Sequence, residues 1–385
     1  MTPFITIASL GMVSFGMVLT MLGASLPVII ERFGIDTIAA GGLLALLSLG
    51  VVAGSVSFGP IVDRRGYKGM LVLSFACIAI GLEVVAFAPS LAVLRLALIV
   101  IGYTGGLLNG AANALVADVA TGNRSAALTF VGAFFGVGAA GVPLLLAMFS
   151  TTLPFASILA GCGAFVIIPL VVTWRSPFPE SKQPHGFPVA EARRLLHNPL
   201  LLLISAMMFI ESGIESTAGG WTPTLFVRDL GVSIQRAPLY LSIFWFGLLL
   251  GRLILSAVLR ATRPSQVLLT SLCVALVASL IVVLTRGTTL AALGVFLLGA
   301  GFASTFPILY GVVGERFTSL SGTALGIGMA IALTGGTLLP YFTGAVAMRY
   351  GLRAAFYAVP VGVVVLAVLV ATSRQRLWPA SRTAT

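Results

Sequence analysis

Twelve apolar segments recur along the chain of 385 residues, and their lengths constrain its fold more than any other feature. A bilayer core about 30 Å thick needs about 20 consecutive apolar residues in a helix. Because the segments are this long and do not alternate between apolar and polar residues, they predict membrane-spanning helices and disfavour a β-barrel. They cover residues 4–30, 38–58, 70–88, 91–117, 125–149, 153–174, 200–227, 238–259, 266–285, 290–312, 322–347 and 352–372.

The composition also indicates a membrane protein. Hydrophobic residues make up 58% of the chain and charged residues only 9%, whereas soluble domains carry about 25% charged residues. The net charge of +11 does not indicate a nucleic-acid partner, because most basic residues fall in the loops on one side of the twelve segments. The positive-inside rule then predicts cytoplasmic termini, and we expect a bacterial inner membrane.

The chain divides into two halves of six segments each. The longest loop, residues 175–198, is rich in proline and charge and separates an N-terminal bundle (1–174) from a C-terminal bundle (199–372) and a cytoplasmic tail (373–385). An offset of about 197 residues aligns the halves and pairs Gly54 with Gly251, Gly102 with Gly299, Asp118 with Glu315, and Pro143 with Pro340. Internal duplication of this kind is typical of transporters, whose sites lie near the midplane between the repeats.

Two acidic residues, Glu211 and Glu215, lie in the middle of the seventh apolar segment. Burying a charged group at this depth costs from roughly 3 to well over 10 kcal/mol, so it is a functional-site candidate by default. A spacing of four residues places both carboxylates on one face of a helix. Two like charges in a low dielectric favour protonation of at least one of them, which suits a proton carrier. The structural alternative is a protonated side chain that hydrogen-bonds to a neighbouring helix.

A charged turn follows the second segment and reads Gly-Pro-Ile-Val-Asp-Arg-Arg-Gly-Tyr-Lys from Gly59. Gly66 allows the positive φ of a tight turn. The run resembles the signature loop of the major facilitator superfamily in Gly59, Asp63, Arg64, Gly66 and Lys68, and departs from it at Tyr67. The resemblance implies an all-α membrane protein, with twelve transmembrane helices in two pseudo-symmetric six-helix bundles. It also implies that this loop latches the cytoplasmic side, with Asp118 as the matching acid of the fourth segment.

Within that superfamily, several short runs resemble the fucose–galactose–glucose:proton symporter branch. They are Asn109 to Asn113, Glu215 to Trp221, Gly251-Arg252, and Gly299 to Pro307. The resemblance implies that segments one, four, seven and ten line a midplane cavity. In this branch the fourth segment often has an acid where this chain has Asn109. We therefore expect coupling to rest on Glu211 or Glu215, with uniport as the alternative.

Other polar and aromatic residues inside the segments are candidates for solute contact. Asn109 and Asn113 share a helix face and either bind solute hydroxyls or pair helices. Trp221 and Trp245 either stack on a sugar ring or belong to the aromatic belt of the membrane. Tyr310, which the offset pairs with Asn113, is a further candidate. Arg252 either snorkels or acts as the gating charge of the second half.

A structural ion pair is expected between Glu83 and Arg95, because each lies six residues from Pro89 at the top of one helical hairpin. Cys77, Cys162 and Cys273 are widely separated, and the two histidines share one loop, so neither set predicts a disulfide or a metal site. No cofactor is indicated. The sequence also lacks a Gly-Lys-Ser/Thr phosphate loop, which argues against ATP-driven transport.

These observations favour a secondary transporter over an enzyme. We expect alternating access around a midplane cavity that binds a small polar, monosaccharide-like solute and a proton or other coupling ion, in a protein that is monomeric in the lipid bilayer. The solute site is expected to comprise Asn109, Asn113, Glu211, Glu215, Trp221, Trp245 and Tyr310. One alternative is a proton-coupled exporter of amphipathic or cationic compounds. An alternative of another class is a membrane sensor or scaffold that does not transport.

Overall fold

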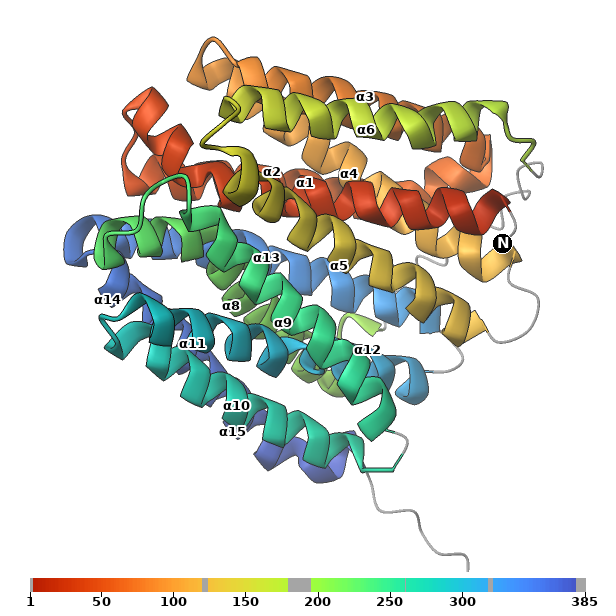
Figure 1. Ribbon diagram of the computed structural model, residues 1–385. Helices are drawn as coiled ribbons and strands as arrows, with labels where there is room; N and C mark the ends of the chain where they lie inside the picture. The colour runs from red at the N-terminus through yellow and green to blue at the C-terminus, as the bar shows by residue number, and fades with distance from the viewer. Residues whose placement is uncertain (1–2, 120–123, 179–194, 260, 318–320, 379–385) are drawn as a thin grey trace, which may run out of the picture.

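The computed structural model describes residues 3–119, 124–178, 195–259, 261–317 and 321–378, and Figure 1 shows that these residues form a bundle of long helices. No strand occurs in these ranges. The helices are α1 (Pro3–Phe33), α2 (Thr37–Arg65), α3 (Tyr67–Phe87), α4 (Leu91–Val119), α5 (Arg124–Phe149), α6 (Phe155–Arg175), α8 (Pro199–Leu230), α9 (Ala237–Val258), α10 (Pro264–Leu284), α11 (Thr288–Phe302), α12 (Thr305–Arg316), α13 (Ser321–Tyr350), α14 (Leu352–Phe356) and α15 (Ala358–Leu377).

The prediction of twelve spans is confirmed, since the described residues contain 12 stretches long and apolar enough to cross a membrane. The third and fourth spans separate at Ala88–Ser90, as expected. The tenth span consists of two helices, α11 and α12, because Pro307 has no N–H to bond to the carbonyl of Ala303. The hydroxyl groups of Ser304 and Thr305 at this break are buried and have no partner.

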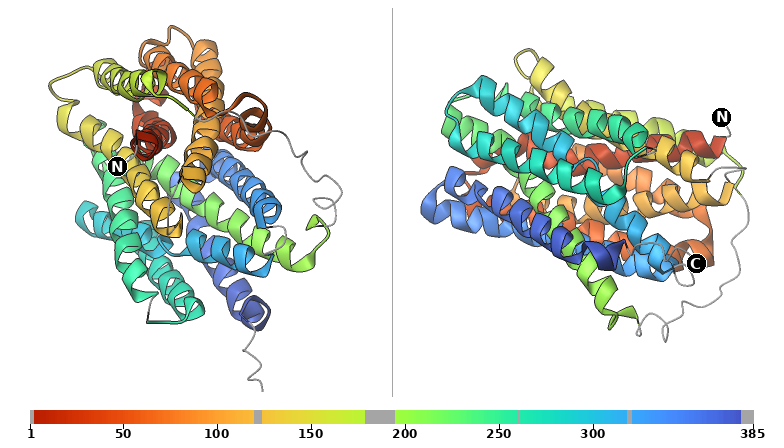
Figure 2. Two further views of the ribbon diagram at one scale, coloured as in Figure 1. Left: turned by 90° about the vertical axis from the view of Figure 1, so that its right-hand side faces the viewer. Right: turned by 90° about the horizontal axis from the view of Figure 1, so that it is seen from below.

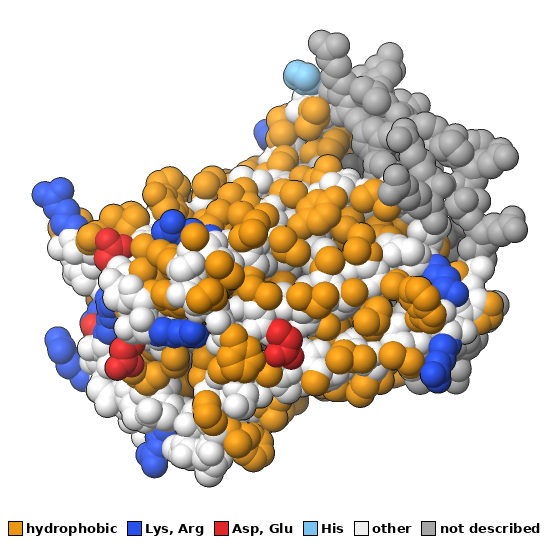
Figure 3. All heavy atoms as spheres, turned by 90° about the horizontal axis from the view of Figure 1, so that it is seen from above, with side chains coloured by type: hydrophobic (Ala, Val, Ile, Leu, Met, Phe, Trp, Pro, Cys, Tyr) orange, Lys and Arg blue, Asp and Glu red, His pale blue; other side chains and the backbone are white. Residues whose placement is uncertain are grey.

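The beginning of α1 and the end of α15 lie on the same face of the bundle, as the right-hand view of Figure 2 shows. We call this the terminal face, and we call the opposite end of the helices the far face. The side of the bundle in Figure 3 is covered by hydrophobic side chains, with Lys and Arg side chains gathered near its two ends. This distribution fits a bundle surrounded by hydrocarbon between two aqueous boundaries.

Helices α1–α6 form one half of the bundle and α8–α15 form the other, and Figure 2 separates them in its end-on view. In the first half, α1 packs on α4 and α5, α2 on α4, and α3 on α4 and α6. In the second half, α8 packs on α13 and α15, and α11 packs on α9 and α10. The halves meet where α2 contacts α13, α5 contacts α9, and α1 contacts α8.

Glycine seams within the halves repeat with the offset that the sequence indicated. At each seam a Cβ atom on the glycine would collide with a backbone carbonyl of the neighbouring helix, so only glycine allows the close approach. Equivalent glycines meet equivalent carbonyls in α2/α4 and α9/α11: Gly50 meets Ile99 and Gly247 meets Phe296; Gly54 meets Tyr103 and Gly251 meets Ala300; Gly102 meets Leu47 and Gly299 meets Phe244.

Two arginines cap equivalent helix ends at the far face, although they come from different elements. Arg32 at the end of α1 donates to the carbonyls of Ala86 and Ala88 at the end of α3, at 3.2 and 2.9 Å. Arg353 of α14 donates to the carbonyls of Val283 and Thr285 beyond α10, which the same offset relates to Ala86 and Ala88. Arg353 also pairs with Asp229, with Nε and Oδ1 3.7 Å apart. These contacts satisfy carbonyls that a helix end leaves without donors.

The charged run after the second span is less of a loop than the sequence suggested. Residues 59–65 continue α2 as a helix, and the turn into α3 takes place at Gly66 alone. Gly66 has φ 73°, and its N–H bonds to the carbonyl of Val62 at 2.7 Å. The positive φ expected at Gly66 is therefore confirmed, and it explains why a glycine is needed there.

The glycine seams generate a prediction about stability. Gly102→Ala and Gly299→Ala each place a methyl group against a carbonyl of the neighbouring helix. We expect each substitution to destabilise the protein by about 1–3 kcal/mol through overpacking, measured as a lower Tm of the purified protein. Gly141→Ala is the matched control, because a Cβ there meets nothing within 4 Å. Equal Tm values for all three variants would contradict the seam interpretation.

Candidate functional site

One stripe of α8 is accessible in the middle of the membrane, and it is polar. Ser212, Glu215, Ser216 and Gly219 are half-buried, while the residues between them are buried. Their spacing of three and four residues places them on one helix face. Asn198 caps the start of α8 by accepting from the N–H groups of Leu200 and Leu201, and Gly231 ends the helix with φ 66°. The helix therefore presents a hydrophilic strip inside an otherwise apolar bundle.

The two glutamates occupy different environments on α8. Glu211 is 1% exposed and its Oε1 atom has no hydrogen-bond partner, whereas Glu215 belongs to the accessible stripe. Their carboxyl groups interact with each other, and both interact electrostatically with Arg252 of α9. Two carboxylates and one guanidinium together carry one unit of excess negative charge, which one bound proton neutralises. The arrangement can therefore hold a proton at membrane depth.

Arg252 lies on the face of α9 that meets the other half of the bundle. It shares one face of α9 with Trp245 and Leu249, which contact α5 of the other half at Phe135 and Gly136. One helical turn nearer the terminal face, a Cβ on Gly132 of α5 would meet nothing within 4 Å. Arg252 therefore lies about one helical turn from the contact of Leu249 with α5, towards the terminal face.

Aromatic rings cross from one half to the other at the same level. Phe15 of α1 contacts Phe135 of α5 with ring centroids 5.6 Å apart, and Phe135 contacts Trp245 of α9 edge-to-face at 5.7 Å. Phe244 then contacts Trp245 at 5.2 Å. The Nε1 atom of Trp245 is buried and has no partner among the described residues. An unpaired indole N–H of this kind is available to a polar ligand.

The far face is closed by close packing between the halves. A Cβ on Gly344 of α13 would collide with the carbonyl of Thr37 on α2, and a Cβ on Gly41 would lie 3.2 Å from the carbonyl of Pro340. Trp221 of α8 is fully buried beside Gly344, and its Nε1 donates to the carbonyl of Pro340 at 3.0 Å. Trp221 therefore braces α13, and the expectation that it contacts solute is not met in this structure.

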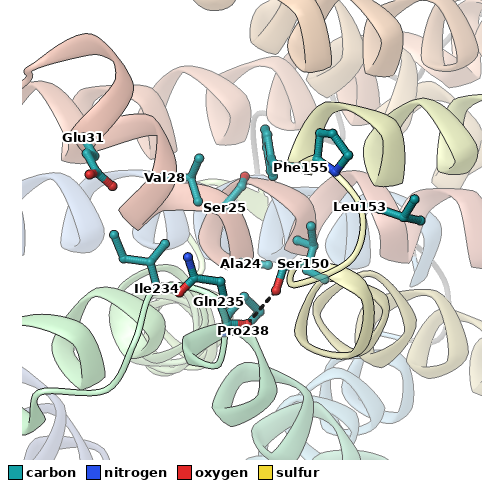
Figure 4. Close-up of a pocket in the computed structure, with 12 residues that line it drawn as sticks. Ala24, Ser25, Val28, Glu31, Ser150, Leu153, Phe155, Ile234, Gln235 and Pro238 are labelled. Atoms are coloured by element: carbon teal, nitrogen blue, oxygen red, sulfur yellow. Dashed lines mark hydrogen bonds between the residues drawn. The ribbon is translucent and has the colours of Figure 1, made fainter.

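A pocket of about 230 Å³ lies at the far face, where Figure 4 shows Ser150 and Gln235 bridging the halves. Ser150 Oγ donates to the carbonyl of Gln235 at 3.0 Å. The hydroxyl of Ser242 similarly donates across the halves to the carbonyl of Ala140 at 3.0 Å. These two bonds join α5 and its following turn to α9 and its preceding turn, so they reinforce the closure between α2 and α13.

The two asparagines of α4 are paired with each other. Asn113 Nδ2 donates to the backbone carbonyl of Asn109 at 2.9 Å and to its Oδ1 at 3.1 Å. Both residues are half-buried, and the pair leaves Nδ2 of Asn109 and Oδ1 of Asn113 for contact with a solute. Tyr310 of α12 is half-buried as well and stacks on Phe306 with ring centroids 5.6 Å apart. Lys68 is exposed at the start of α3.

Some expected contacts differ from the sequence interpretation. Glu83 and Arg95 do not form the expected ion pair in the described structure: Arg95 is exposed, while the carboxylate of Glu83 lies against Gly163 of α6. Equal distance from Pro89 gives equal depth but does not set the direction of either side chain. Of the expected gating residues, Gly59, Asp63, Arg64 and Asp118 fall on positions whose side chains lie outside the described part of the structure.

The sequence interpretation missed two features of this site. It found no cation in the span of the glutamates, and the structure supplies Arg252 from α9. The signal was available, because a charged residue within an apolar span marks a functional position. It also passed over Ser212 and Ser216, whose four-residue spacing beside Glu215 indicates a polar face. The described residues contain no group of three or more His, Cys, Asp or Glu side chains that could hold a metal ion.

Comparison with known proteins identifies the family. The sequence profile of the Major Facilitator Superfamily matches residues 8–332. The chain belongs to this superfamily. The match covers nearly all of the first half and most of the second, and the duplicated six-helix halves agree with it. Family membership makes this protein a membrane transporter and not an enzyme.

Relatives and solved structures extend the comparison. An uncharacterised MFS-type transporter of Yersinia pestis is 25% identical over 332 residues, which is 84% of each chain. A glucose/galactose transporter of Brucella abortus is 25% identical over 322 residues, covering 78% of this chain and 77% of that protein. The xylose transporter XylE of E. coli, solved in an inward-open conformation, superposes with a TM-score of 0.79 at 13% identity, covering 99% of this chain and 97% of that one. The likeness to XylE shows the fold.

The two buried tryptophans generate a prediction. Trp221→Phe removes a hydrogen bond to the carbonyl of Pro340, so we expect it to lower stability by about 1 kcal/mol. Trp245→Phe removes an N–H that has no partner, and we expect no loss of stability from it. Thermal unfolding of the two purified variants compares them directly. A larger loss of stability in Trp245→Phe than in Trp221→Phe would contradict these assignments.

Proposed function

We propose that this protein is a secondary active transporter that moves a small polar, monosaccharide-like solute by alternating access and couples its movement to a proton through Glu211 and Glu215. The observation that carries the proposal is the cluster of Glu211, Glu215 and Arg252 inside two apolar spans. Ionisable groups at this depth are costly and mark substrate or ion pathways. The similarity to the glucose/galactose transporter of Brucella abortus supports the solute class.

The carboxyl groups of Glu211 and Glu215 have different roles in this mechanism. Glu211 is buried and retains the shared proton, while Glu215 faces the accessible stripe and exchanges with solute and solvent. Arg252 compensates the charge that remains when the proton leaves. Asn109 and Asn113 approach from the other half, and Trp245 offers its unpaired N–H. A solute rich in hydroxyl groups can accept from the indole and donate to the carboxylate and amide oxygens.

Alternating access requires the far face to open, and the structure supports a specific gate there. Gly41 and Gly344 bring α2 and α13 into backbone contact, and Trp221 holds α13 from behind. We infer that the halves rock about the α5/α9 contact and separate α2 from α13 in the opposite state. The run from Gly59 to Lys68, with Asp118 and Arg252, then closes the terminal face.

A second candidate function is proton-coupled export of amphipathic or cationic compounds. The aromatic chain from Phe15 to Phe244 favours it, because an apolar aromatic surface beside two carboxylates suits a lipophilic cation. Competition between cations and protons for the glutamates would distinguish this function from sugar transport. We propose further that the chain works as a monomer in a bacterial inner membrane, with the terminal face on the cytoplasmic side.

Glu215→Gln tests the coupling role. In proteoliposomes, we expect an imposed pH gradient to drive accumulation of a labelled monosaccharide with the unchanged protein. Glu215→Gln should abolish that accumulation and retain equilibrative exchange, because the amide cannot pass the shared proton between Glu211 and solvent. Glu83→Gln is the control, a half-buried membrane carboxylate on α3 away from the cluster. Accumulation by Glu215→Gln equal to that of the unchanged protein would end the coupling proposal, and efflux of cations without sugar flux would favour the exporter.

Gly344→Ala tests the far-face gate. The added methyl group would collide with the Thr37 carbonyl and lie 3.0 Å from Cζ2 of Trp221, so we expect it to weaken closure. A cysteine at Leu44, in a background without the three native cysteines, should then react faster with an impermeant maleimide applied to the far face. Gly42→Ala is the control, because a Cβ there meets nothing within 4 Å. Unchanged labelling in Gly344→Ala would show that this contact does not hold the gate.

A further inference from the structure

The accessible stripe of α8 faces a point where α13 has a carbonyl without its helical donor. Pro340 lies inside α13 and has no N–H, so the carbonyl of Gly336, four residues earlier, loses its ordinary partner. Gly336 packs on the stripe itself: a Cβ there would lie 2.8 Å from Ser212 Oγ and 2.9 Å from Ser216 Oγ. The residue whose carbonyl is freed by Pro340 is therefore the one against which the two hydroxyl groups pack, between α8 and α13.

The hydroxyl groups of Ser212 and Ser216 combine two properties: they make no hydrogen bond to the described residues, and they are half-buried, unlike the fully buried free hydroxyls of Ser205 and Thr217 on the same helix. Serine and threonine side chains in a helix commonly donate to the carbonyl four residues before them. Thr20, Thr104, Thr334 and Thr337 all do so here, at 2.8–3.0 Å. Ser212 and Ser216 have no hydrogen bond in the described part of the chain, and their half-buried state leaves the hydroxyl groups open to a ligand.

The charge around these oxygens is negative. Glu215 lies between Ser212 and Ser216 on the same accessible face, and Glu211 lies behind it with a buried Oε1 atom that has no partner. Arg252 compensates one of the two carboxylates. When Glu211 keeps a proton, Glu215 and Arg252 balance each other, and when the proton leaves, one negative charge remains without a counter-ion.

We propose that Ser212 Oγ, Ser216 Oγ, the Gly336 carbonyl and the Glu215 carboxylate form a binding site for a sodium ion. The ligands are all oxygen atoms, which hard cations prefer, and their single carboxylate suits a monovalent ion. Carbonyls freed by broken helix bonding at the midplane are a known kind of ion ligand in transporters. The site rests on the proposed function in taking this cavity as the transport site, and it adds sodium as a coupling ion at Glu215.

Sodium binding is measured on the purified full-length protein in nanodiscs, without any solute. We expect Tm to rise and saturate as NaCl replaces choline chloride at constant ionic strength, as mass action requires of an ion that binds the folded state. The double variant Ser212→Ala/Ser216→Ala should lose this rise. Ser205→Ala should keep it, because Ser205 lies on the same helix face about two to three turns away, with its hydroxyl beside Gly328.

Two further variants distinguish a loss of sodium binding from a folding defect. Ser212→Cys keeps the side-chain size and replaces a hard oxygen ligand by sulfur, and Gly336→Ala pushes a methyl group between the two hydroxyl groups. Both should weaken binding of radioactive sodium, measured by equilibrium dialysis. Equal Tm curves in NaCl and choline chloride, or a sodium-dependent rise that survives in all of these variants, would overturn the proposal.

The measurement separates this proposal from the proposed function. A protein that binds no sodium but accumulates monosaccharide under a pH gradient overturns the sodium site and retains the function. A protein that binds sodium at these serines but moves no monosaccharide retains the site and rejects the solute class. If a monosaccharide alone raises Tm and the double serine variant loses that rise, the oxygens belong to the solute and the sodium site is overturned.

Discussion

In a hydrocarbon environment the polar groups of the protein can hydrogen-bond only to one another, and the arrangement of this bundle depends on that constraint. At the far face, Arg32 and Arg353 satisfy the carbonyls that end two helices related by the internal repeat. At the midplane, Glu211, Glu215 and Arg252 gather on two adjacent helices. Two of the buried polar atoms without a partner among the described residues, Trp245 Nε1 and Glu211 Oε1, belong to the residues around the accessible stripe of α8.

Glycine supplies the second organising feature, because it sets how closely the helices approach. The seams within each half lock α2 on α4 and α9 on α11, so each half has a rigid core. The same kind of contact between the halves, at Gly41 and Gly344, closes the far face, whereas the ion pair of Arg353 with Asp229 at that face lies within the second half. Rocking of one bundle against the other requires rigid halves that are joined by a contact that can open.

Much of this architecture could be predicted from the sequence, and the failures have physical causes. The twelve spans followed from length and hydropathy, and the positive φ at Gly66 followed from the charged turn around it. The proposed ion pair of Glu83 and Arg95 failed because depth does not set the direction of a side chain. Trp221 was taken for a cavity residue, since the sequence does not show that Pro340, 119 residues away, offers it a carbonyl.

The sequence by itself determined that the chain spans a membrane twelve times, that its halves repeat, and that two carboxylates lie at membrane depth, because each of these depends only on local composition and spacing. Only the tertiary structure decided which carboxylate is buried and which is accessible, which cation compensates them, and that two serines of α8 pack against Gly336 of α13. These properties depend on how helices far apart in the chain rotate and pack, and packing between distant helices leaves no periodic signal in the sequence.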